Sequence, residues 1–352
     1  MTRRRNIWLW ALALTATAIL GVSCTKMPDY DEDDEGWTML SSNVPVAFGT
    51  NLSAPATKTA LPAGTHFGVF AYYTRTSNWN SVKNSTAPNF MYNQEVVFDG
   101  TSCAYSPIKY WPNNTNEKIT FWAYCPYSAN PVIFKQGTNT DFNNATKNIP
   151  DIRFTVTDGQ TDFMISDVAA NKTKPASATP VELTFKHTLS KLSFYVKKVD
   201  PIAKYTVKLK NIRVDGIYLT AVHRSSGWAN WASPRGSVSV FAPADASGYS
   251  VLATSYPAAG SPQGATMLLP QSLDYEYAML HIEYTIDFEG LLHTRTMISN
   301  IPLSLLFEDL DPVAWGEGKE YNVSLSITPD DPIEFSVTWS NWGTVHNNHI
   351  SN

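Results

Sequence analysis

The sequence of 352 residues has little charge and no long apolar run after its first 24 residues. Only 16% of the residues are Asp, Glu, Lys or Arg, and the formal net charge is −5. Much of that negative charge lies in one short acidic run, so the remainder is close to neutral. Nucleic-acid-binding domains normally carry a basic stripe. The composition therefore argues against a nucleic-acid partner and is typical of a secreted, β-rich protein.

Cysteine is also scarce, with only Cys24, Cys103 and Cys125 in the chain. Cys24 follows an apolar leader and is considered with it below. Cys103 and Cys125 could pair in an oxidising compartment. Two residues do not make a disulfide framework, however, and the interpretation we favour is a pair of buried free thiols.

Catalytic and metal-binding signatures are absent from the sequence. It holds no GxSxG, no P-loop and no GxGxxG at the start of a helix. His346 and His349 are three residues apart in a polar C-terminal tail, but a metal site would need further ligands in a fixed frame. DPVAWGEG (311–318) holds acidic residues beside a Trp, a combination that sugar-binding sites sometimes use, but a turn between strands accounts more simply for Pro312, Gly316 and Gly318. We expect no enzymatic activity, no metal and no cofactor.

The first 23 residues have the features of an export signal. Arg3 to Arg5 are basic, and an apolar stretch of about sixteen residues follows, short of the roughly twenty that span a bilayer as a helix. Small residues then precede Cys24. The pattern resembles a bacterial lipoprotein signal peptide, in which the cysteine is acylated. Gly21 stands where such signals usually have Leu, and the alternative is ordinary cleavage near a chance cysteine. Several acyl chains would anchor the protein stably to a membrane.

An acidic run follows Cys24, with six Asp or Glu residues between Asp29 and Glu35. It has no apolar periodicity, so we expect a disordered, self-repelling spacer. Acidic residues close behind a lipidated cysteine also resemble the surface-export signal of lipoproteins in some anaerobic Gram-negative bacteria. We therefore expect display on the cell surface.

Apolar residues elsewhere recur with a period of two, which indicates half-buried antiparallel strands. We find no long amphipathic helical pattern outside the leader. Turn clusters such as PNNTN (112–116) separate the short strands and favour sandwiches or barrels. The alternating apolar residues are Leu192, Phe194 and Val196; Tyr284, Ile286 and Phe288; Tyr321, Val323, Leu325 and Ile327; and Ile333, Phe335, Val337 and Trp339.

The stretch ANKTKPASATP (170–180) is the most linker-like internal segment. It divides the chain after the leader into two parts of similar size, each large enough for one domain. We therefore predict four regions: a signal peptide (1–23), the lipidated cysteine with its acidic linker (24–40), an N-terminal β-sandwich domain (41–176) and a C-terminal β-sandwich domain (177–352).

Two segments, 67–79 and 109–127, are dense in Tyr, Trp and Phe. Exposed rings could form a stacking platform for sugars. Alternating aromatic residues on strands also bury large apolar areas in a sandwich core, and we favour that interpretation.

Several segments together resemble the fimbrillin family, the pilins and fimbria-associated lipoproteins of anaerobic Gram-negative bacteria of the gut and mouth. The similarity extends in order through nearly all of the chain after Cys24, and KYWP, FWAYxP and FxHxLSKL are its most specific parts. The segments are VPVAFGT, ATKTALPAGTHFGVFAYYT, YSPIKYWPNNTNEKITFWAYCPY, DFMIS, VELTFKHTLSKLSFYVKK and WGEGKEYNVSLSIT with IEFSVTW.

The resemblance implies two tandem β-sandwich domains of transthyretin-like topology and assembly by strand exchange. An N-terminal strand is removed by proteolysis, and a strand from the next subunit takes its place by β-augmentation. The candidate first strand is VPVAF, with Val44, Val46 and Phe48. The candidate donor strand is IEFSVTW, with Ile333, Phe335, Val337 and Trp339. Either segment could equally be a permanent strand of its own sandwich.

The resemblance also bears on processing, because family pilins of mouth bacteria are cut after an arginine upstream of the first retained strand. Between Cys24 and Thr74 this chain has no arginine, and Lys58 is the only lysine downstream of VPVAF. Cleavage at Lys58 or at a non-basic site would give a stalk or tip subunit, and an uncut chain would stay lipid-anchored as an anchor or accessory protein. The expected partners are other fimbrial subunits, the outer membrane and a surface glycan or protein. The alternative function is a glycan-binding surface lipoprotein that uses exposed aromatic residues.

Overall fold

The computed structural model describes residues 41–53, 61–128, 147–157, 161–199, 204–242, 247–251, 265–273, 276–290 and 293–342. Within these ranges the chain is almost entirely β-sheet, as the period of two predicts, and its helices α1 (Trp79–Val82) and α2 (Leu303–Leu306) have four residues each. Neither described helix has the length and apolar character needed to cross a membrane. The all-β prediction is confirmed.

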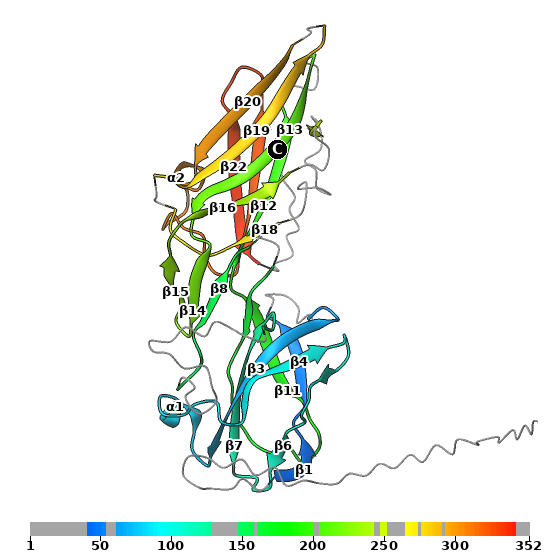
Figure 1. The fold of residues 1–352 in the computed structure, drawn as a ribbon, viewed down its shortest axis with the longest axis vertical. Helices are drawn as coiled ribbons and strands as arrows, with labels where there is room; N and C mark the ends of the chain where they lie inside the picture. Colours follow the sequence, from blue (N-terminus) through cyan, green and yellow to red (C-terminus); the bar gives the residue numbers. More distant parts are fainter. Residues whose placement is uncertain are drawn as a thin grey trace, which may run out of the picture.

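The N-terminal part of the chain forms one eight-stranded sheet in the order β2-β11-β9-β7-β3-β4-β5, with β10 paired to β7. A separate short pair, β1 with β6, lies at the bottom of the molecule in Figure 1. The strands are β1 (Ser41–Pro45), β2 (Phe48–Leu52), β3 (Thr65–Arg75), β4 (Met91–Phe98), β5 (Cys103–Ala104), β6 (Tyr110–Pro112), β7 (Lys118–Cys125), β9 (Met164–Ser166), β10 (Ala169–Lys172) and β11 (Val181–His187).

The eight-stranded sheet folds over its own core. Phe48 on β2 lies 5.6 Å from Phe121 on β7, measured between ring centroids, although β11 and β9 separate these strands in the sheet. Phe67 on β3 and Phe185 on β11 are likewise 5.4 Å apart. The inward-facing residues of this sheet and of β6 therefore form one apolar cluster, which we call the first core.

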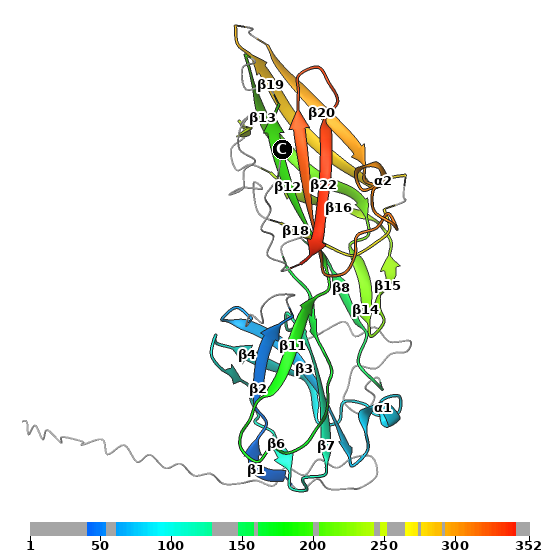
Figure 2. The same cartoon turned by 180° about the vertical axis from the view of Figure 1, so that it is seen from behind.

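The C-terminal part is a sandwich of two sheets, in the orders β18-β12-β21-β22 and β16-β13-β19-β20, with β17 on β13. Figures 1 and 2 show the two sheets facing each other in the upper half of the molecule. The strands are β12 (Ser190–Lys198), β13 (Tyr205–Ile217), β16 (Gly236–Phe241), β17 (Tyr249–Val251), β18 (Thr266–Leu268), β19 (Met279–Phe288), β20 (Thr294–Pro302), β21 (Lys319–Ile327) and β22 (Glu334–Asn341).

A three-stranded sheet of β15 (Gly227–Ala232), β14 (Thr220–Arg224) and β8 (Ile152–Thr155) lies between the two halves. Its strand β8 comes from the part of the chain before residue 176. Conversely, β11 follows residue 177 but pairs with β2 and β9 in the first sheet. The sheet pairings therefore change after β11 rather than at the predicted boundary of 176. The division into two domains, and the transthyretin-like topology, stay predictions.

The alternation in the sequence predicted which side chains are buried in the upper sandwich. On β21, Tyr321, Val323, Leu325 and Ile327 are each at most 3% exposed. The inward residues of β12, β13 and β19 belong to the same cluster, which we call the second core. Phe288 is only partly buried, because it ends β19 at the tip of the sheet.

The aromatic-rich segments 67–79 and 109–127 also pack inside the molecule. Phe67 and Trp111 belong to the first core. Trp79, Trp122 and Tyr124 belong to the second core, which extends across the far face of the first sheet. Burial of these rings confirms the core interpretation of both segments.

The two described cysteines are free thiols, as the sequence favoured. Burial raises the pKa of Cys125 to about 12 and that of the half-buried Cys103 to about 11. Both thiols therefore stay protonated and unreactive at neutral pH.

The backbone at position 216 lies so close to the backbone of Tyr277 that only glycine fits there. Gly216 has a φ of +72°, and a Cβ there would meet the carbonyl oxygen of Tyr277 at 1.9 Å. Gly290 has a similar φ of +82° but nothing within 4 Å. We expect Gly216→Ala to lower the free energy of unfolding by about 3 kcal/mol, and Gly290→Ala by about 1 kcal/mol. Urea denaturation measures both, and equal losses would contradict the close approach.

Candidate functional site

The predicted first strand VPVAF is a corner between two strands rather than one strand. Val44 and Pro45 end β1, Val46 lies between the strands, and Phe48 begins β2. Pro45 has no backbone N–H to continue a ladder, which accounts for the break. We call residues 41–52, which include both strands, the edge segment.

Within the edge segment, β2 has one neighbouring strand among the described residues, while β1 pairs separately with β6. Strand β2 is the first strand of its sheet and pairs in parallel with β11, from Phe48 opposite Val181 to Leu52 opposite Phe185. All other described pairings of this sheet are antiparallel. The backbone N–H of Ser53 extends the pairing by donating to the carbonyl of Phe185 at 2.6 Å. Figure 2 shows β2 lying alongside β11.

Two side chains of the edge segment close the first core. Val46 is 2% exposed and Phe48 is 4% exposed. The ring of Phe48 lies 5.6 Å from the rings of both Tyr105 and Phe121, between centroids. Val44 and Leu52 pack against the same cluster but are only partly buried. Removal of this segment would expose the inner side of β11 and the aromatic residues under Phe48.

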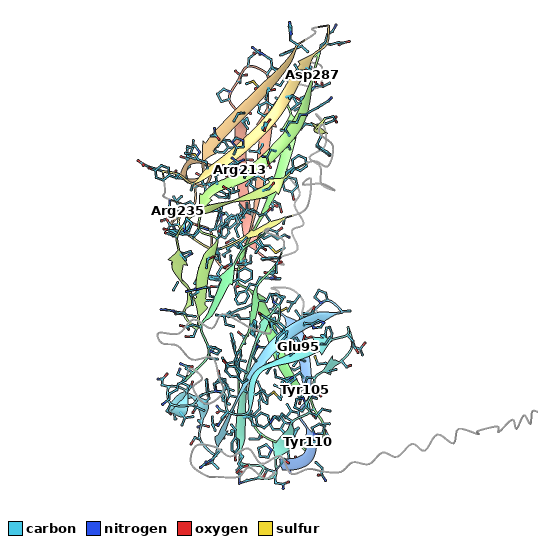
Figure 3. All side chains as sticks on the ribbon, in the orientation of Figure 1. Glu95, Tyr105, Tyr110, Arg213, Arg235 and Asp287 are labelled. Carbon is cyan, nitrogen blue, oxygen red and sulfur yellow. The ribbon has the colours of Figure 1, made fainter. Side chains whose placement is uncertain are left out.

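Tyr105 fastens the corner of the edge segment. Its hydroxyl donates to the carbonyl of Val46 at 2.8 Å and accepts from the backbone N–H of Lys109 at 3.3 Å. The N–H of Val46 in turn donates to the carbonyl of Lys109 at 2.9 Å. Burial raises the pKa of Tyr105 to about 12, so the hydroxyl remains a donor at physiological pH. Figure 3 shows Tyr105 in the same part of the molecule as Tyr110 on β6.

The candidate donor residues lie on β22 or just before it, at the edge of the upper sandwich. Ile333 precedes the strand and is 8% exposed. Phe335 and Val337 face the second core and are partly buried. Trp339 is 54% exposed, and the ammonium of Lys319 lies 4.9 Å from its ring. Strand β22 is paired with β21 along eight residue pairs, so it is an integral strand of this sheet.

The two groups of predicted strand residues are therefore not brought together within one chain. Val44, Val46 and Phe48 are on the first core, and Phe335 and Val337 are on the second. Cys24 and Lys58 lie outside the described residues, as do His346 and His349. The residues that flank Lys58 are placed: Ser53 ends the pairing of the edge segment, and Leu61 is 3% exposed in the first core.

A shallow hollow of about 380 Å³ lies where the ends of β11 and β22 meet. The ring of His187 stacks on that of Trp342 with centroids 3.9 Å apart, and its Nδ1 lies 2.5 Å from Asp162. Among the residues that line the hollow, the only carboxylate is that of Glu317. No group of three or more His, Cys, Asp or Glu residues in the described ranges could hold a metal ion. The hollow does not present the paired carboxylates that glycoside hydrolysis uses.

Sequence reasoning missed Tyr105 and Glu182. Tyr105 is 59 residues away from the carbonyl that it holds, and no local pattern distinguishes it from other tyrosines. Glu182 is exposed on β11, where its Oε2 accepts from Asn51 Nδ2 at 2.6 Å. The Glu182 contact depends on β2 pairing with a strand about 130 residues later, and the Tyr105 contact on a segment 59 residues away. The alternation of single strands reveals neither.

Comparison with known proteins gives a family and a fold. A profile described as fimbrillin-like matches residues 55–342. The fimbrium subunit Fim1C of Phocaeicola vulgatus is 33% identical over 196 residues, which cover 54% of this chain and 51% of that protein. The chain thus spans about half the length of the curated relative it matches.

Two crystal structures share the fold. A fimbrial protein from Bacteroides vulgatus superposes with a TM-score of 0.56 at 20% identity, covering 84% of this chain and 99% of that chain. A candidate cell adhesion protein from Bacteroides uniformis superposes with a TM-score of 0.52 at 14% identity, covering 85% and 98% respectively. At these identities the likeness concerns the fold alone.

The geometry of the edge segment predicts that it opens independently of the rest of the chain. Phe48→Ala leaves a cavity beside Phe121 and should destabilise the segment by about 3 kcal/mol. Amide hydrogen exchange should accelerate in β2 and along β11 and stay unchanged in β21. The matched control is Ile108→Ala, since Ile108 lies nearby but is 49% exposed, and it should change exchange little. Equal acceleration in β2 and β21 after Phe48→Ala would show that the segment does not open separately.

Proposed function

Because the chain belongs to the fimbrillin-like family, we propose that it is a subunit of a cell-surface fimbrium, acts in adhesion and joins its neighbours by strand exchange. The observation that carries this proposal is the position of the edge segment. It covers the first core with Val46 and Phe48, yet among the described residues its β2 strand pairs on one side only. If the segment leaves, two described strand pairs are broken, β2 with β11 and β1 with β6, and all the others stay intact.

Departure of the edge segment would open a site that fits an extended strand. The freed side of β11 would offer unpaired backbone N–H and carbonyl groups from Val181 to Phe185. The inner side chains Val181, Leu183 and Phe185 are each at most 5% exposed and would form pockets at alternate positions. Backbone pairing with apolar pockets spaced two residues apart is the basis of β-augmentation.

We propose that β22 stays in its own sandwich and that the edge segment is the one exchanged. Strand β22 has eight pairs with β21, and Phe335 and Val337 pack against the second core. Its release would therefore disrupt the upper sandwich. The incoming strand would come from another fimbrial subunit, which makes such subunits the principal partners.

The lipid anchor and the processing site complete the proposal. Acylation at Cys24 would tether the new subunit to the outer membrane, with the acidic residues that follow as a spacer. Cleavage after Lys58 would remove the whole edge segment, since that segment ends at Leu52. A cut chain would enter the polymer as a stalk or tip subunit, and an uncut chain would remain at its base as an anchor.

Mass spectrometry of the cell-surface protein tests processing and anchoring together. Polymers should contain chains that begin at Thr59, and membrane fractions should contain acylated chains that begin at Cys24. Lys58→Gln should abolish the first form and leave the second. Lys26→Gln is the matched control, because Lys26 is the other lysine between Cys24 and Thr74, and it should change neither form. Polymers built only from chains that retain residues 41–52 would contradict the proposal.

A further inference from the structure

Thr50 occupies the middle inward-facing position of β2, between Phe48 and Leu52. In the parallel register it lies beside Leu183, which is fully buried. Thr50 itself is 8% exposed. Its hydroxyl oxygen is buried and has no hydrogen-bond partner among the described residues. A polar atom thus faces an apolar core at the centre of the edge segment.

Buried hydroxyls on the permanent strands of the same sheet are paired. Thr120 on β7 accepts a hydrogen bond from the backbone N–H of Asn171 at 3.0 Å. Ser166 on β9 accepts one from the backbone N–H of Ala123 at 2.9 Å. Thr50 on the edge strand therefore differs from the hydroxyl residues that this sheet keeps in its interior.

A second unpaired polar atom lies on the same side of the first core. Trp111 on β6, the partner strand of β1, is 1% exposed, and its indole Nε1 has no described hydrogen-bond partner. Its ring lies 5.8 Å from Phe121, the residue that Phe48 also contacts. Two buried polar groups without described partners therefore lie near the edge segment, and Trp315 Nε1 is a comparable group in the second core.

The missing hydrogen bond weakens the hold of the resident strand. A buried hydroxyl without a partner has given up its bonds to water and gained none in exchange. Valine has nearly the same shape without the hydroxyl, so it would fill the space beside Leu183 with no such loss. On the outer face, Gly49 has no side chain, and the bond from Asn51 to Glu182 is exposed. Neither Gly49 nor Asn51 compensates for the hydrogen bond that the Thr50 hydroxyl lacks among the described residues.

We infer that Thr50 keeps the resident strand replaceable, and that the strand which displaces it carries an aliphatic side chain beside Leu183. The incoming strand belongs to another subunit of the polymer, so the inference rests on the proposed function. The inference further implies that the exchange favours replacement of the resident strand by the strand of a neighbouring subunit. The groove holds its own strand less tightly than the strand of a neighbour, because only the neighbour presents an apolar side chain at this position.

Thr50→Val in the full chain tests the inference. Amide hydrogen exchange in β2 should slow by about tenfold, and polymer assembly should slow with it. Thr120→Val is the matched control, because it removes a paired hydroxyl from the same core. That variant should instead accelerate exchange in β7. Thr50→Ser keeps the hydroxyl but loses the methyl group, and it should accelerate exchange in β2.

Two outcomes would overturn the inference. If Thr50→Val leaves exchange in β2 unchanged or faster, the hydroxyl does not weaken the strand; the proposed function is unaffected by that result. If exchange in β2 slows but assembly keeps its rate, opening of the edge segment does not control assembly. That second result leaves the proposed function standing, which only polymers that retain residues 41–52 would contradict.

Discussion

The architecture depends on a core that is closed by β2, a strand with one neighbouring strand in the part of the chain that the structure describes. Strand β2 is held by β11 on one side, by the hydrogen bond from Tyr105 to the carbonyl of Val46, and by the packing of Phe48. The buried side chains of Val46 and Phe48 stabilise the first core while the segment is in place. Among the described residues, the outer edge of β2 has no paired strand and the buried hydroxyl of Thr50 has no partner, and we propose that both features weaken the hold of this segment.

The rest of the chain provides a fixed frame around that weak segment. The second core is continuous from the upper sandwich to the outer face of the first sheet, where it includes Trp122 and Tyr124. Strand β8 leaves the first half to pair with β14, and the ring of Trp342 stacks on His187 at the end of β11. Displacement of the edge segment would therefore leave β11, the acceptor strand of the proposed exchange, anchored at its far end.

The sequence was informative wherever a pattern is local. Alternation in YNVSLSIT predicted the buried face of β21 because side chains of a strand point to opposite faces in turn. The aromatic segments were correctly interpreted as core for the same reason. VPVAF was recognised as apolar, but the break at Pro45 was not predicted. Tyr105, Glu182 and the placement of β11 in the first sheet depend on contacts between distant segments, and no local pattern carries that information.

A reversible disulfide between β2 and β11 would show whether the edge segment must leave before subunits assemble. Asn51 on β2 and Thr184 on β11 lie opposite each other on the outer face of the parallel pair, so Asn51→Cys with Thr184→Cys would join the strands by a disulfide. Cys103 and Cys125 are held protonated by burial and should not interfere. Asn51→Cys alone is the control for loss of the bond to Glu182. The account predicts that the oxidised double variant does not polymerise and that reduction restores assembly at the rate of the single variant. Polymerisation of the oxidised, cross-linked chain at an unchanged rate would contradict it.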